Sequence, residues 1–222
     1  MTPQLTQSIG ALYDAFELVP KPESIAACPC CLSDEEIAIL LTKPLRDISE
    51  GELCTYASKA LLTVGEESDF RYYLPRILEV LVSEPGWWPD PEVVGRALLN
   101  AGWTGWSSTE KQAVSGVFET MVVESLVDPE GSDLDSWLCA VARCGMDLPL
   151  FLRRVASSDE AVLALYTQNA GAIMQGKLAN EFWEDVPVEA KLMLEWFYST
   201  EVRLLILESY GVELNPPIAP QP

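Results

Sequence analysis

Residues 49–65 read SEGELCTYASKALLTVG, and this stretch holds the signals that decide the fold. Ser49 and Glu52 form a capping-box pattern, in which the serine oxygen accepts from one free amide and the glutamate reaches back to another. Gly65 favours the end of the helix, because glycine readily adopts the left-handed conformation of a C-terminal cap. The stretch therefore predicts an amphipathic helix. Its apolar residues at helical spacing are Leu53, Tyr56, Ala57, Ala60, Leu61 and Val64.

The same helical signals recur on both sides of this stretch. Two further capping-box patterns, Ser33 with Glu36 and Ser107 with Glu110, each precede apolar residues at helical spacing. Pro75 predicts a break within the segment 70–82, because proline removes an amide donor. Sustained strand alternation and Asn-Gly or Asp-Gly hairpin turns do not occur in the sequence. Further helices are expected over 133–144, 149–155, 158–174, 186–198 and 200–211.

The sequence thus predicts an all-α fold of about ten helices packed as antiparallel pairs. A HEAT-like array and an irregular single helical domain both satisfy this pattern, since no clean internal repeat is visible. We expect one helical domain over residues 1–214, with a candidate sub-boundary near residues 128–133. Residues 215–222 contain four prolines, which predicts an extended tail.

The chain is strongly acidic. Its 222 residues include 34 Asp and Glu, 14 Lys and Arg and no His, which gives a formal net charge of -20. The excess is evenly spread, with 17 acids and 8 bases in residues 1–111 and 17 and 6 in residues 112–222. Such a surface repels nucleic acid and anionic membranes and attracts basic surfaces, although solubility alone also explains it. We expect a basic protein partner, no nucleic acid and no membrane. Arg71 and Arg76 are expected to neutralise neighbouring carboxylates.

Patterns that carry catalysis are absent from the sequence. The lack of histidine removes the commonest general base near neutral pH. No Gly-rich phosphate loop and no Gly-x-Ser-x-Gly nucleophile elbow occurs. We therefore expect that the protein is not an enzyme. The first residues lack a basic and apolar signal, and no run approaches the ~20 apolar residues of a membrane span, so a cytoplasmic location is expected.

Cys28-Pro29-Cys30-Cys31 is the most unusual local feature. Three thiols within four positions suggest zinc, which prefers four Cys or His ligands. Cys54 is a further candidate ligand, but the spacing lacks the paired Cys-x-x-Cys elements of a structural site. The favoured expectation is no metal and no cofactor, with the thiols packed as small apolar groups beneath the following helix. A zinc site and a thiol-dependent role remain the alternatives.

Four of the seven tryptophans lie close together in the sequence, at positions 87, 88, 103 and 106. Tryptophan is enriched both in protein cores and in recognition surfaces. On so acidic a chain, indole rings beside carboxylates are suited to receive Arg or Lys from a partner. The predicted partner-binding residues are Trp87, Trp88, Trp103, Trp106, Glu84, Asp90 and Glu92.

A resemblance to other proteins is carried by the Cys28–Cys31 element, by Leu45 and by the segment Phe70-Arg71-Tyr72-Tyr73-Leu74-Pro75-Arg76-Ile77-Leu78-Glu79. The chain resembles a group of uncharacterised bacterial helical proteins that share a Cys-Pro-Cys-Cys element and an aromatic-Leu-Pro-Arg-x-Leu-Glu element. The resemblance covers about residues 25–125. It implies a bacterial origin and a compact helical fold, and it transfers no catalytic residue.

Acidity, tryptophans and the lack of catalytic motifs together favour an acidic protein-interaction module. By analogy with motif-poor acidic inhibitors, we expect an immunity protein that occludes a basic toxin or enzyme. The alternatives are a metal- or thiol-dependent protein built on the Cys28–Cys31 cluster and a helical scaffold protein.

Overall fold

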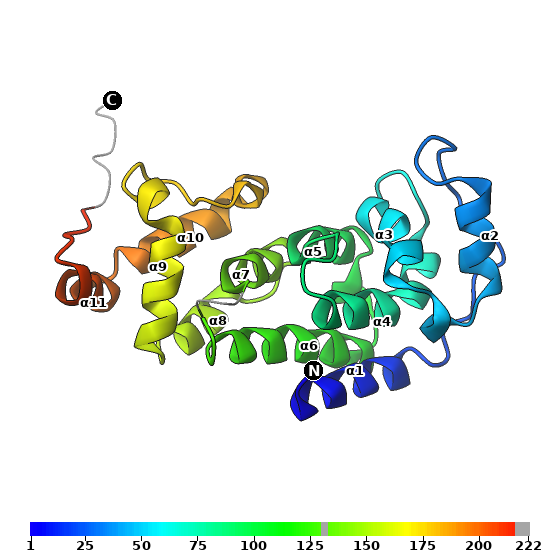
Figure 1. The fold of residues 1–222 in the computed structure, drawn as a ribbon, viewed down its shortest axis with the longest axis horizontal. Helices are drawn as coiled ribbons and strands as arrows, with labels where there is room; N and C mark the ends of the chain where they lie inside the picture. The colour runs from blue at the N-terminus through cyan, green and yellow to red at the C-terminus, as the bar shows by residue number, and fades with distance from the viewer. Residues whose placement is uncertain (130–132, 216–222) are drawn as a thin grey trace. The chain divides into compact units, whose positions relative to one another are not determined.

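A computed structural model describes residues 1–129 and 133–215 (Figure 1). The prediction of an all-α fold is confirmed. The described residues form eleven α-helices and three short 3-10 helices, and they contain two isolated β-bridges but no strand. Among the described helices, every one is too short or too polar to cross a lipid bilayer.

The chain divides into two compact units, Met1–Met121 and Val122–Pro222, and helix α6 contains the division. The predicted single domain over 1–214 remains a prediction. The candidate boundary at 128–133 and the tail at 215–222 fall largely outside the described residues. Unit 1 holds α1 (Pro3–Ala15), α2 (Asp34–Thr42), η1 (Leu45–Asp47), α3 (Glu50–Lys59), α4 (Glu67–Ser83), α5 (Pro91–Asn100), η2 (Trp103–Gly105) and most of α6 (Ser108–Ser125).

Unit 1 is built around the buried face of α4. Helix α1 packs against α4, and α3 contacts α2, α4 and α5. The starts of these helices follow from local chemistry, because Ser33 and Ser49 form the capping boxes predicted for α2 and α3. Tyr73 is fully buried in α4, and its hydroxyl donates to the Leu40 carbonyl at 3.0 Å, which joins α4 to α2.

The predicted break at Pro75 is wrong. Helix α4 runs without interruption from Glu67 to Ser83, with Pro75 inside it and buried. A proline in a helix interior loses one backbone hydrogen bond and crowds the preceding turn. Here Phe70, Leu74 and Leu78 lie in the core on the same helix, so tertiary packing outweighs that local penalty.

The predicted role of Gly65 as the end of a helix is also wrong. Helix α3 ends at Lys59, and Gly65 lies in the link to α4 with φ +72. A Cβ atom at this position would lie 2.9 Å from the Tyr56 hydroxyl oxygen. Glycine is therefore required twice here, for the left-handed backbone and for the close approach of a buried ring.

Replacing Gly65 with alanine is expected to lower the free energy of unfolding of unit 1 by about 2 kcal/mol, from left-handed strain and the Tyr56 clash. Urea unfolding followed by circular dichroism measures the change. Gly51→Ala is the matched control, because a Cβ at Gly51 meets open space in helix α3, and it is expected to leave stability unchanged or raised. Equal effects of the two substitutions would contradict this explanation.

Unit 2 contains the rest of α6, five further α-helices and the short 3-10 helix η3, and the predicted positions of the five α-helices are confirmed to within two residues. Its interior includes a polar cluster centred on the buried Asp135 carboxylate in the first turn of α7. Asn169 of α9 and Trp183 of η3 both donate to this carboxylate, at 3.1 and 3.3 Å. The helices of unit 2 are α7 (Leu134–Arg143), α8 (Leu148–Val155), α9 (Asp159–Ile173), η3 (Glu181–Asp185), α10 (Pro187–Phe197) and α11 (Thr200–Tyr210).

Candidate functional site

The Cys28–Cys31 segment is a turn attached to the link between α3 and α4. The Cys28 amide donates to the Thr63 carbonyl at 3.1 Å, and the Gly65 amide donates to the Ala26 carbonyl at 2.7 Å. The turn itself is closed by the Cys31 amide, which donates to the Cys28 carbonyl at 2.8 Å. The backbone that leads into the thiols is thus bonded to the link between α3 and α4, and the turn is closed before α2 begins.

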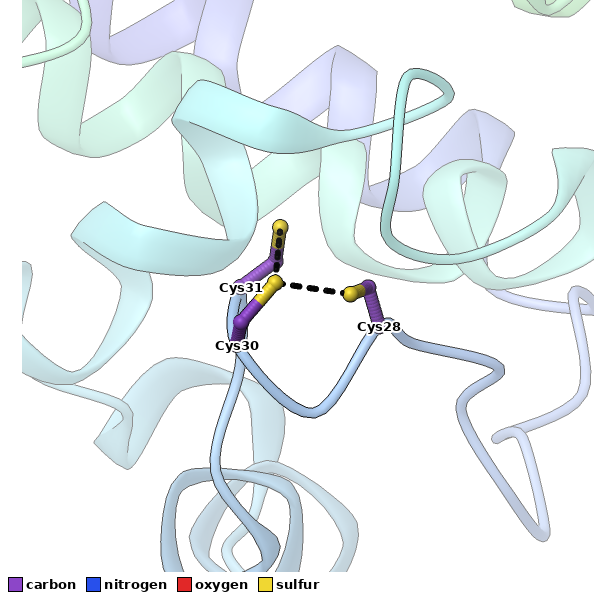
Figure 2. A group of neighbouring side chains, drawn as sticks. All are labelled: Cys28, Cys30 and Cys31. Carbon is purple, nitrogen blue, oxygen red and sulfur yellow. Dashed lines mark hydrogen bonds between the residues drawn. The ribbon is translucent and has the colours of Figure 1, made fainter.

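The three cysteine sulfurs of this turn lie together at the surface. Cys30 Sγ lies between the other two, 2.8 Å from Cys28 Sγ and 3.8 Å from Cys31 Sγ (Figure 2). All three sulfurs lie within 4.8 Å of one another. Cys28 and Cys30 are exposed, and Cys31 is half-buried. We call these three residues the thiol cluster; it is the arrangement in which a single soft ion would contact several sulfurs at once.

The close sulfurs change one another's proton affinity. The hydrogen bond from Cys30 lowers the pKa of Cys28, because it stabilises the Cys28 thiolate. The same contact, together with that to Cys31, raises the pKa of Cys30 to about 11, because Cys30 keeps its proton as the donor. A thiolate is the reactive and metal-binding form of cysteine, so Cys28 is the member of the thiol cluster prepared for either chemistry.

Helix α3 supplies a cation to this turn but no fourth sulfur to the cluster. Lys59 Nζ donates to the Cys31 carbonyl at 2.8 Å, which places a positive charge beside the turn. Cys54 lies on α3 and is half-buried, and burial raises the pKa of its thiol. Among the described residues, the group within reach of one ion consists of the thiol cluster alone. Cys54 is therefore not placed among the candidate ligands, and Lys59 is a neighbour that the sequence did not reveal.

The tryptophans of the predicted partner surface do not lie on one surface. Trp103 and Trp106 are buried, with 5% and 7% of their surface exposed, and Glu92 is 1% exposed. The Trp106 indole N–H donates to Glu67 Oε1 at 3.0 Å, and its ring packs edge-on against Phe16. The prediction that Trp103, Trp106 and Glu92 bind a partner is therefore wrong. They lie in the interior of unit 1, where burial of large aromatic rings removes much apolar surface from water.

The remaining predicted residues lie around an exposed turn between α4 and α5. Trp88 is 48% exposed, Glu84 is exposed, and Trp87 and Asp90 are half-buried. The Trp87 indole N–H donates to the Glu50 carbonyl at 2.9 Å, so this turn is anchored at the start of α3. Glu50 is exposed and brings a further carboxylate that sequence proximity could not indicate. We call Glu50, Glu84, Trp87 and Trp88 the Trp88 surface.

Unit 2 offers a hollow that was not predicted. It has a volume of about 640 Å³ and is lined by side chains that include Glu160, Leu163, Thr167 and Tyr210. The Thr167 and Tyr210 hydroxyl groups lie 3.2 Å apart at its wall. Its residues come from α9, from Tyr210 of α11 and from Asp128 and Pro129 after α6, which are distant in the chain, so no local pattern indicates it.

Comparison of the chain with protein-family models, curated proteins and solved structures yields no match. The resemblance to Cys-Pro-Cys-Cys proteins therefore stays a prediction.

Proposed function

We propose that this chain is an acidic binding protein that covers a basic protein partner through the Trp88 surface. The observation that carries the proposal is the exposed Trp88 ring on a turn that begins at the exposed Glu84 and that the Trp87 indole joins to the backbone of the exposed Glu50. Exposed tryptophan is a frequent interface anchor, and neighbouring carboxylates pair with Arg or Lys. The partner therefore has the chemistry of a basic surface, such as the phosphate-holding site of an enzyme that acts on nucleic acid or nucleotides.

Charge supports the association at longer range. The net charge of -20 attracts a basic partner before contact and raises the association rate, an effect that salt weakens. Exposed carboxylates recur at the starts of α2 and α4, as at Asp34 and Glu66. The proposed biological role is an inhibitor that covers the basic site of a toxin. Weak binding to several partners would instead indicate a scaffold protein.

The double variant Trp88→Ala/Glu84→Gln is expected to bind a fluorescein-labelled oligo-arginine peptide about tenfold more weakly than the wild type, by loss of one ring anchor and one charge. Fluorescence anisotropy at low and high NaCl measures the affinity. The matched control is Leu18→Ala/Glu17→Gln, which also removes one exposed apolar side chain and one exposed carboxylate from unit 1. Equal weakening by both variants would show that binding follows diffuse charge and would reject the Trp88 surface.

The inhibitor role has a separate test. The chain is co-expressed with a basic, growth-arresting protein encoded by a neighbouring reading frame, and growth is expected to recover. Recovery is expected to fail with Trp88→Ala/Glu84→Gln and to persist with Leu18→Ala/Glu17→Gln. A neighbour without toxicity would reject the inhibitor role, whereas the peptide experiment decides on binding itself.

A further inference from the structure

We infer that the thiol cluster, Cys28, Cys30 and Cys31, is a three-thiolate site for copper(I). This site lies apart from the Trp88 surface in the chain and uses none of its residues, so it goes beyond the proposed binding of a basic partner.

The sulfur positions suit one shared ion. Three sulfurs bound at about 2.3 Å to one ion in a plane lie roughly 4 Å from one another. The separation of 3.8 Å between the sulfurs of Cys30 and Cys31 already has this value. The sulfurs of Cys28 and Cys30, at 2.8 Å, need to move apart by roughly 1 Å on that basis. Both side chains are exposed, so rotation about their χ1 bonds provides this movement without repacking the core.

The number of donors favours copper(I) over zinc. Soft thiolates bind copper(I), zinc and iron–sulfur clusters, so ligand type alone does not choose between these metals. Structural zinc sites in proteins use four protein ligands in a tetrahedron. The chain contains no histidine. Within the described residues, no carboxylate joins the three sulfurs in the group that a single ion could contact. A zinc ion here would depend on water for its fourth ligand, whereas three thiolates complete a trigonal copper(I) site.

The surroundings admit an ion and balance part of its charge. The exposed sulfurs of Cys28 and Cys30 leave the site open to an incoming metal complex, from which thiolates take over the ion by exchange. The Lys59 ammonium group, held on the Cys31 carbonyl, offsets negative charge of the bound thiolates. The backbone hydrogen bonds donated by the Cys28 and Gly65 amides hold the turn in place while the cysteine side chains rotate.

The test uses the full chain, reduced and kept without oxygen, titrated with copper(I) in the presence of bicinchoninate as a coloured competitor. We expect one equivalent of copper(I) to bind, and X-ray absorption to show three sulfur neighbours. Cys30→Ser is expected to weaken binding by about a hundredfold or more, because it removes the central ligand. Cys54→Ser is the matched control and is expected to bind as the wild type does. Circular dichroism checks that both variants fold.

Each other outcome overturns part or all of this assignment. No copper(I) retained against the competitor, or equal loss in Cys30→Ser and Cys54→Ser, rejects the site. Tighter binding of zinc than of copper(I), measured by competition with a coloured zinc chelator, rejects the choice of metal. A Cys28–Cys30 disulfide that persists in excess reductant rejects both. The peptide-binding experiment on Trp88 is unaffected by any of these results, so the two proposals fail independently.

Discussion

Replacing Asp135 with alanine is expected to lower the free energy of unfolding of unit 2 by about 3 kcal/mol. The Asp135 carboxylate is buried and accepts from the Asn169 amide and the Trp183 indole N–H. Both donors are themselves buried, at 1% and 2% exposure, so the substitution leaves them without this acceptor and opens a small cavity. Urea unfolding gives the magnitude, and hydrogen exchange read by mass spectrometry locates the loss in residues 133–214.

The matched control for Asp135 is Asp159→Ala. Asp159 also lies in the first turn of a helix but is exposed, so its loss is expected to cost no more than the few tenths of a kcal/mol that a helix terminus provides. Burial raises the pKa of Asp135, although its hydrogen bonds act against this. The folded state therefore binds the Asp135 proton more tightly than the unfolded state. The contribution of Asp135 to the free energy of unfolding is therefore largest at low pH. It falls as the pH rises from the pKa of about 3.9 in the unfolded chain toward the higher pKa in the folded protein. Similar losses in the two variants would contradict the cluster as a stabilising feature.

Replacing Glu110 with alanine is expected to lower the free energy of unfolding of unit 1 by about 2 kcal/mol. Glu110 is 5% exposed, accepts from the Arg71 guanidinium and caps its own helix through the Ser107 amide at 3.0 Å. Breaking a fully buried pair costs about 3–5 kcal/mol. The Arg71 side chain is one-third exposed and regains water, which reduces the expected loss. Urea unfolding at several pH values measures it.

The pH dependence of the Glu110 effect has the opposite sign to that of Asp135. Burial alone would raise the pKa of Glu110, but the hydrogen bonds from Arg71 and Ser107 together lower it. The stabilisation by Glu110 is therefore complete above its pKa of about 4.3 in the unfolded chain. It is lost as the pH falls through the lower pKa of Glu110 in the folded protein. Glu35→Ala, at an exposed first-turn position of α2, is the control and should show neither the loss nor this pH dependence. A constant difference between wild type and Glu110→Ala across this range would refute the ionic explanation.

The helices could be predicted because their signals are local. The capping boxes at Ser33, Ser49 and Ser107 each involve residues three positions apart, and the structure contains all three. Helix α1 was not predicted, although Thr2 followed by Pro3 is a usable start signal. The prediction of a break at Pro75 was wrong because packing contacts with distant residues keep the helix continuous, and the local sequence does not encode these contacts.

The candidate sites were predictable only in part. Three cysteines within four positions already require their sulfurs to be near one another, but Lys59 reaches the Cys31 carbonyl from helix α3, which local sequence does not indicate. Similarly, Trp88 and Trp103 are close in sequence and yet one is exposed and the other buried, because the path of the chain between them decides which ring faces solvent. The pairing of Arg71 and Arg76 with carboxylates was expected from composition, and their partners are Glu110 and Glu79.

Two backbone hydrogen bonds join Ala26 and Cys28 to Thr63 and Gly65, and they would also affect the thermodynamics of copper(I) binding at the proposed site. In zinc fingers, the chain gives up its conformational entropy when the ion arrives, so chelation and folding are one event. Here the segment that carries the sulfurs is already ordered by the protein, and that entropic penalty was met during folding. For the copper(I) site proposed above, ion binding and folding would consequently be uncoupled, so that the ion could bind and leave while the helices around the thiol cluster keep their places.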